Sequence, residues 1–197
     1  MWTFFAPTKA KIGASLIIVG AMWASESLAG AYHGEVIDAD TGEPLSGAVV
    51  VVSWMKRPIV TMDGPVYFHD AKEALTDAQG SFSIDCRRRV DLNPFTYVER
   101  PMVIVFKPGY EPLAPGSPAT KSFGSFDQLR RELMHGTVVK LPRLRPEQAD
   151  WRKHPAGLVT DLGDVGLGGN TPRQRIPNLL RLIEIQRRRL GLDASTR

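Results

Sequence analysis

This chain has a single cysteine, no long apolar run and a small net charge, and each of these features excludes a class of protein. The single cysteine, Cys86, has no partner within the 197 residues, so a disulfide inside the chain is excluded. The apolar run Ile12–Trp23 is shorter than the about 20 residues that a membrane-spanning helix needs. The net charge of +4 is too small to indicate nucleic acid as a partner, whereas 43% hydrophobic residues are typical of a globular protein.

Catalytic motifs are missing as well. The chain has no Gly-x-Ser-x-Gly, His-Glu-x-x-His or Cys-x-x-Cys sequence and no phosphate-binding glycine loop. The four histidines are scattered and do not repeat the spacing of metal ligands: His33, His69, His135 and His154. We therefore expect a protein that is not an enzyme and that holds no cofactor or metal. For Cys86 we favour a buried, inert thiol; a reactive thiolate beside Arg87–Arg89 is the alternative.

Residues 1–31 follow the order of a secretory signal peptide. Lys9 and Lys11 precede the apolar run, and the small residues Ala29–Ala31 follow it. We expect cleavage near Ala31 and a periplasmic or secreted mature protein; an uncleaved membrane anchor is the alternative. No cysteine directly follows the run, which argues against a lipid-anchored lipoprotein.

Two short stretches predict the centre of the fold. In Gly34–Ala48 a strand is followed by Asp38–Glu43, which is dense in turn formers, and the chain then enters the valine run Val49–Val52. That run is apolar on both faces, as in a central strand. Ala74–Ile84 repeats the order of strand, turn and strand, and its segment Asp77–Gly80 predicts a β-hairpin.

These stretches resemble the carboxypeptidase regulatory-like domain family. The sequence Gly-x-Val-x-Asp-x-x-Thr-Gly-Glu-Pro-Leu-x-Gly-Ala begins at Gly34, Thr-Asp-x-x-Gly-x-Phe spans Thr76–Phe82, and a strand with a Gly-Tyr corner spans Val103–Tyr110. The three occur in the family's order and cover about residues 34–144. The resemblance implies a small transthyretin-like (prealbumin-like) β-sandwich. It also implies a non-catalytic accessory or binding module of secreted and surface proteins, and no particular substrate.

Further patterns complete the predicted fold. Met102–Lys107 and Thr137–Leu144 are predicted strands, and the apolar spacing in Phe126–Met134 predicts a short helix before the last strand. We expect a mainly β protein whose seven-stranded, transthyretin-like sandwich is followed by a C-terminal amphipathic α-helix.

The chain then divides into four parts. The signal peptide of residues 1–31 precedes the sandwich of residues 32–146, and a Gly-rich linker occupies residues 147–170. A basic amphipathic helix occupies residues 171–197, with Thr171 as its N-cap and a proline in the first turn.

The loops suggest a carbohydrate site as one hypothesis. Met55–Asp70 mixes prolines with polar and aromatic residues, so we expect an excursion with some strand character that offers a binding surface. The flat faces of aromatic rings suit sugar rings. The candidate ligand-binding residues are Trp54, Tyr67, Phe68 and Tyr97. Packing of these aromatics on the sandwich edge is the alternative.

Two metal hypotheses are weaker. Asp38 and Asp40 suggest calcium, but the spacing departs from the EF-hand loop, and Asx-turn capping explains both aspartates without a metal. Tyr67, His69 and Tyr97 supply residue types of an intradiol dioxygenase, an enzyme group on a similar sandwich. The closely spaced histidine pair of those enzymes is absent here.

The C-terminal helix suggests a partner site. It combines seven arginines with an apolar stripe, and its candidate partner-binding residues are Ile176, Leu179, Leu180, Ile183, Arg187 and Arg188. Such a helix can dock on a protein partner or a second copy, or lie on an anionic membrane surface. Alternatively, its leucines pack back on the sandwich while the arginines stay solvated. We expect, for the whole chain, a component of a cell-envelope assembly, with a carbohydrate-binding module as the alternative.

Overall fold

The computed structural model of the chain describes residues 30–60, 65–85, 92–115, 117, 120, 123–144 and 172–190. The signal peptide up to residue 29, the state of Cys86 and the linker in residues 147–170 lie outside the described residues. Within the described part the fold is mainly β, with seven strands in two sheets and two α-helices. The mainly β prediction is therefore confirmed, as are its seven strands, the short helix before the last strand and the C-terminal helix.

The smaller sheet has three strands in the order β4-β1-β7. Its central strand, β1 (Ala31–Asp38), pairs antiparallel with β4 (Ser81–Asp85) and parallel with β7 (Thr137–Leu141). Ala31, near which we expected cleavage, is the first residue of β1 and is buried. Helix α1 (Phe126–His135) leads into β7 and packs against β1.

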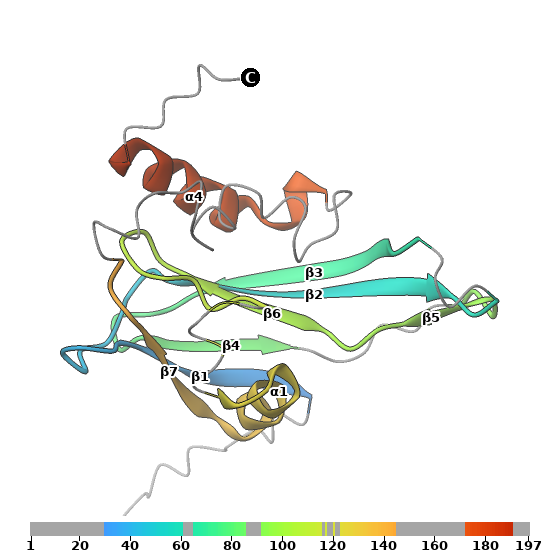
Figure 1. Ribbon diagram of the computed structural model, residues 1–197, viewed down its shortest axis with the longest axis horizontal. Helices are drawn as coiled ribbons and strands as arrows, with labels where there is room; N and C mark the ends of the chain where they lie inside the picture. Colours follow the sequence, from blue (N-terminus) through green and yellow to red (C-terminus); the bar gives the residue numbers. More distant parts are fainter. Residues whose placement is uncertain are drawn as a thin grey trace, which may run out of the picture.

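The larger sheet is organised around β2 (Val49–Pro58), as the valine run predicts. One side of β2 pairs with β3 (Tyr67–Leu75) from Val49 to Lys56. On the other side, β6 (Met102–Phe106) pairs with the first half of β2 and β5 (Thr96–Val98) pairs with the end. The two sheets face each other, and α4 (Pro177–Arg189) lies along the outer face of the larger one (Figure 1).

Two apolar layers follow from the alternation of side chains along β2. Val50 and Val52 point into the core between the sheets, where they meet Val36 and residues of α1. Val49 and Val51 point the other way, into a second apolar layer beneath α4. Because both faces of β2 are covered, the whole valine run is buried.

The predicted hairpin at Asp77–Gly80 is wrong. The strand before this turn, β3, pairs with β2, whereas the strand after it, β4, pairs with β1 in the other sheet. The turn itself forms as expected, because Oδ1 of Asp77 accepts hydrogen bonds from the amides of Gln79 and Ser81 at 2.9 and 2.8 Å. It therefore carries the chain from one sheet to the other.

The predicted excursion at Met55–Asp70 is more regular than expected. Strand β2 continues to Pro58 and β3 begins at Tyr67, with a register shift between Trp54 and Met55. Strand β5 lies beside the same end of β2. These strands run past the sandwich as an arm, drawn to the right in Figure 1. We use "arm" for the described residues 54–60, 65–70 and 92–100.

Among the described helices, none combines the length and the apolar composition that spanning a membrane requires.

Candidate functional site

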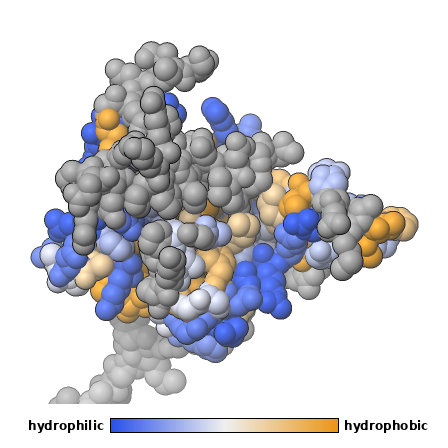
Figure 2. All heavy atoms as spheres, viewed as in Figure 1, coloured by the Kyte–Doolittle hydropathy of each residue, from blue (hydrophilic) through white to orange (hydrophobic). Residues whose placement is uncertain are grey.

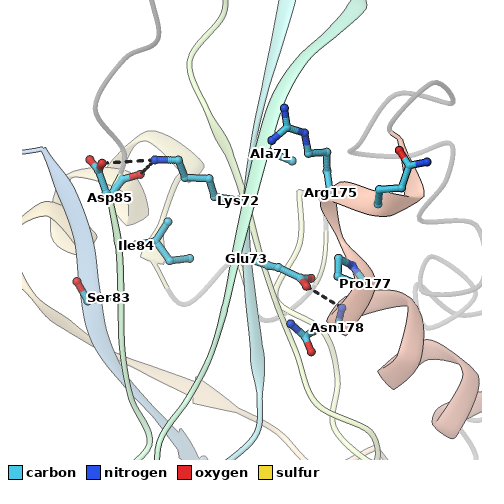
Figure 3. A pocket seen from close by; sticks show the side chains of 10 residues that line it. Ala71, Lys72, Glu73, Ser83, Ile84, Asp85, Arg175, Pro177 and Asn178 are labelled. Carbon is cyan, nitrogen blue, oxygen red and sulfur yellow. Dashed lines mark hydrogen bonds and ion pairs between the residues drawn. The ribbon is translucent and has the colours of Figure 1, made fainter.

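A pocket of about 490 Å³ lies where the start of the C-terminal segment meets the sandwich (Figure 3). It is lined by Lys72 and Glu73 of β3, Asp85 of β4, Arg175, and Asn178 in the first turn of α4. Arg175 belongs to a 3₁₀ turn, Arg173–Arg175, that precedes the helix. The pocket therefore brings together residues that are about a hundred positions apart in the sequence.

Glu73 holds the beginning of α4. Its Oε1 accepts a hydrogen bond from the amide of Asn178 at 2.7 Å, and its Oε2 accepts one from the amide of Leu179 at 3.0 Å. The first amides of a helix have no partner inside the helix, and the helix dipole favours negative charge there. A carboxylate from another element thus serves as the cap.

The sequence predicts that this helix begins just after Thr171, but it begins later in the structure. Helix α4 begins at Pro177, and the preceding Ile176 provides no side-chain cap. Proline suits the first helical position because it lacks an amide hydrogen that would otherwise go unpaired. The predicted cap, Thr171, lies outside the described residues. Sequence patterns find caps that are local in the chain, whereas Glu73 reaches α4 only through the fold.

The other charges of the pocket are paired within the chain as well. The amino group of Lys72 donates to the carbonyl oxygen of Asp85 at 2.8 Å and lies 3.5 Å from its Oδ2. Arg175 Nη1 lies 3.6 Å from Oδ1 of the buried Asp70. Because cations and carboxylates in and beside this pocket are matched, we interpret it as the docking site of the C-terminal segment.

The far end of α4 is fixed by a second set of contacts. Oε1 of the buried Gln186 accepts a hydrogen bond from the amide of Gly109 at 2.8 Å. Arg189 donates to the carbonyl oxygen of Pro108 at 3.1 Å. The turn after β6 therefore fixes the C-terminal end of α4, whereas Glu73 fixes its beginning.

The predicted partner residues of α4 lie mostly against the protein itself. Ile176 and Leu179 are buried in the layer over β2, and Leu180 and Ile183 are partly buried there. Leu182 is also buried, and sequence analysis missed it although it follows Leu179 at helical spacing. Packing of the helix back onto the sandwich is thus what the structure shows.

The two arginines proposed with that stripe differ in exposure. Arg188 is exposed and pairs with Glu184 at 3.1 Å, one helical turn earlier. Arg187 is half-buried. The two arginines therefore do not form one exposed basic face, and the apolar stripe that was proposed with them is buried.

Asp38, the aspartate of the first motif, lies at the centre of a polar cluster. Its Oδ1 accepts hydrogen bonds from the amides of Asp40 and Thr41 at 2.8 and 3.1 Å, as the predicted Asx turn requires. Its Oδ2 accepts hydrogen bonds from the hydroxyl of Tyr110 at 2.9 Å and from Nε of Arg143 at 2.7 Å. Burial raises the pKa of Asp38, but these hydrogen bonds outweigh burial and lower the pKa to about 2.

The same cluster bears on the calcium hypothesis. Both carboxylate oxygens of Asp38 are already occupied by donors of the chain, so a cation would have to displace them. Within the described residues, no group of three or more His, Cys, Asp or Glu side chains is placed to hold a metal ion.

The end of the arm carries exposed apolar side chains. Ile59 is 55% exposed, Val60 82%, Leu92 91% and Phe95 68%. Figure 2 shows hydrophobic residues at this extremity, to the right, beyond hydrophilic residues of the arm. We call these four residues the tip. Sequence analysis did not single them out, although the uncharged runs Pro58–Val60 and Leu92–Val98 were the available signal.

Backbone pairing defines the order of residues behind the tip. The amide of Ile59 donates to the carbonyl oxygen of Phe95 at 2.8 Å, so the two tip segments lie side by side. Further back, Arg57 is opposite Tyr97, and Lys56 is opposite both Tyr67 and Val98. Two tyrosines and two cations thus follow the apolar tip.

The four proposed sugar-binding aromatics do not form one surface. Trp54 is buried in the core between the sheets, and Phe68 is partly buried against the layer beneath α4. Tyr67 and Tyr97 are exposed, but they are opposite Lys56 and Arg57, which are neighbours on β2 and point to opposite faces. A sugar ring therefore cannot stack on both tyrosines at once.

No protein-family model, no curated protein and no solved structure matches the chain significantly.

Proposed function

We propose that this chain is a non-catalytic, extracytoplasmic binding module of a cell-envelope assembly, built on a transthyretin-like β-sandwich. The observation that carries the proposal is the exposed apolar tip of the arm, formed by Ile59, Val60, Leu92 and Phe95. The location outside the cytoplasm rests on the signal-peptide pattern of residues 1–31.

Sequence and structure together support the finer fold assignment. The motif beginning at Gly34 places Asp38 in the Asx turn between the sheets, and the second motif places Gly80 at a positive φ of 74°. The third motif ends at Tyr110, whose hydroxyl reaches Asp38. These three motif residues therefore have structural roles where the sheets are joined, and none of these roles requires a substrate.

Exposure of the tip favours a binding role for the arm. Burying a large apolar side chain contributes about 1.5–3 kcal/mol, so leaving four of them in water forgoes stability that the fold could otherwise gain. Contiguous exposed apolar residues mark interaction surfaces more often than isolated ones do. Apart from Tyr67 and Tyr97 on the arm, the remaining large apolar residues that are exposed in the described part lie on separate elements: Leu75, Met134, Val138 and Ile185.

The arm also replaces the C-terminal stripe as the proposed partner surface. Ile176 and Leu179 pack on the larger sheet, so a partner would have to detach α4 before reaching them. The tip needs no such rearrangement. Its residues stand at the end of the paired strands β2, β3 and β5.

A sedimentation experiment with isolated cell envelopes tests the proposal. Purified full chain should co-sediment with envelope fragments, and the double variant Val60→Ser, Phe95→Ser should bind about tenfold or more weakly. Met134→Ser is the matched control, because Met134 is a similarly exposed apolar residue on α1. Equal binding by wild type and the double variant would remove the tip as the binding surface.

A further inference from the structure

We infer that the tip of the arm enters an anionic lipid surface. This inference rests on the proposed function and names the partner of the same surface. It follows from the order of side chains along the arm, from their charges and from the shape of the arm.

The order of side chains matches the layers of a membrane interface. Among the described residues of the arm, the aliphatic and phenyl groups of Ile59, Val60 and Phe95 come first, and Tyr97 and Arg57 stand behind them. Interfacial regions of bilayers favour tyrosine and tryptophan at headgroup level, with aliphatic groups deeper.

The distances along the strand fit the same layers. An extended chain rises about 3.3 Å per residue, so Val60 stands at most roughly 10 Å beyond Arg57. Amphipathic elements that lie in a membrane interface bury their apolar side about 5–10 Å deep. With the tip at that depth, the guanidinium group of Arg57 would lie among the phosphate groups.

Charge on the arm complements an anionic surface. The described tip segments 59–60 and 92–95 contain no charged residue. Behind them the described arm carries the cations Lys56, Arg57 and Arg100 against the carboxylates Asp70 and Glu99, a balance of +1. Glu99 pairs with Arg57, and Asp127 of α1 pairs with Arg100. The local balance is positive, and the whole chain carries +4. Basic residues near an anionic bilayer are attracted by its surface potential, within about a Debye length.

The shape of the arm favours lipid over a protein partner. The tip is the end of a projecting set of strands (Figure 1), and Leu92 and Val60 are among its most exposed side chains. Protein interfaces concentrate their binding energy on residues that fill desolvated pockets of the partner. A fluid bilayer accepts a projecting apolar end without a matching groove.

Vesicles of pure lipid test this inference. Full chain should co-sediment with vesicles of phosphatidylcholine mixed with phosphatidylglycerol, and it should bind vesicles of phosphatidylcholine alone more weakly. The double variant Val60→Ser, Phe95→Ser should lose about tenfold or more of the binding, and Met134→Ser should retain it. Raising the salt concentration should weaken binding to the mixed vesicles. Because every variant shares the rest of the chain, any contribution of Ile12–Trp23 is common to all.

A depth measurement provides a second test. A spin label at Val60→Cys, in a chain whose only native cysteine is removed by Cys86→Ser, should become accessible to oxygen and shielded from an aqueous relaxation agent on vesicle binding. The same label at Met134→Cys should remain accessible to the aqueous agent. A label at position 60 that stays in water would overturn the inference.

The two proposals fail in different ways. If the tip variants lose binding to envelope fragments while wild type does not bind either kind of vesicle, the lipid inference is wrong, and the proposed function stands with an envelope partner other than lipid. If the tip variants bind envelope fragments as wild type does, both proposals are wrong. Vesicle binding that depends on the tip supports both.

Discussion

The hydroxyl of Tyr110 donates to Oδ2 of Asp38 at 2.9 Å, although the two residues are 72 positions apart. Arg143 reaches the same oxygen at 2.7 Å. Burial raises the pKa of Tyr110, and its hydrogen bond to Asp38 raises it further. The hydrogen bond to Asp38 also raises the pKa of Arg143. One carboxylate thereby joins the end of β1, the corner after β6 and the segment after β7.

This cluster predicts a loss of stability in acid. The pKa of Asp38 is about 2 in the folded chain, against about 3.9 for an ordinary aspartate. A lowered folded-state pKa contributes stability that is present above the unfolded-state pKa and is lost as the pH falls toward the folded-state pKa. The difference in unfolding free energy between wild type and Asp38→Asn should therefore be constant near neutral pH. It should shrink between about pH 4 and pH 2.

Denaturant unfolding at a series of pH values measures this effect. Asp40→Asn is the control, because the Asp40 side chain is exposed and only its amide contacts Asp38. That variant should follow the wild-type pH profile closely. Tyr110→Phe should lie between the two, since it removes one of the hydrogen bonds that lower the pKa of Asp38. A difference for Asp38→Asn that persists unchanged at pH 2 contradicts the assigned pKa.

Leu179→Ala should destabilise the protein strongly. Leu179 is fully buried between α4 and the larger sheet, and such truncations cost about 2–5 kcal/mol because a cavity remains. Ile185→Ala, on the same helix at an exposed position, should change stability by about 0.5 kcal/mol or less. Urea unfolding of the two variants makes the comparison. Equal effects would show that α4 does not pack on the sheet in solution.

Glu73→Ala should loosen the beginning of α4. The variant leaves the amides of Asn178 and Leu179 without their carboxylate partner, and losing a cap costs about 0.5–2 kcal/mol. Hydrogen exchange of those two amides should become faster than in wild type, while amides of the buried strand β6 change less. Glu184→Ala, which removes an exposed helix ion pair, is the control and should have a smaller effect. Unchanged exchange in Glu73→Ala would argue against the cap.

Gly80→Ala should be much more damaging than Gly42→Ala. Both glycines have positive φ, 74° and 73°, so alanine at either position carries a backbone penalty of about 1–2 kcal/mol. A Cβ on Gly80 would also lie 2.5 Å from the carbonyl oxygen of Val36, whereas a Cβ on Gly42 meets nothing within 4 Å. Thermal unfolding should show a modest decrease for Gly42→Ala and a much larger one, or failure to fold, for Gly80→Ala. Similar melting temperatures would contradict the close approach of the turn to β1.

The local elements could be predicted from the sequence, because their causes are local. The valine run Val49–Val52 is apolar at every position, so it has to be covered on both faces, and it is. The spacing of Leu129 and Leu133 indicates the helix that α1 forms. The turn formers of Asp38–Glu43 produce an Asx turn, since the carboxylate of Asp38 reaches amides two and three residues ahead.

Only the tertiary structure decided which partner each element takes. The turn at Asp77–Gly80 is a hairpin by pattern, yet its two strands enter different sheets, because pairing depends on which edges the rest of the chain leaves open. Trp54 has the aromatic side chain that a sugar-binding site needs, but it is buried, because the face of β2 that carries it points toward the core.

The same holds for the proposed sites. The apolar stripe around Leu179 needed a cover, and the sequence left open whether that cover was the sandwich, a second copy or another protein; the structure places it on β2 and its neighbours. The tip of the arm joins Ile59 and Phe95, which are 36 positions apart in the sequence and adjoin through one backbone hydrogen bond. Sequence alone determined what each segment can form, because propensity and periodicity act within a few residues. Burial and pairing between distant segments decided what each one does form, because they depend on the packing of the whole chain.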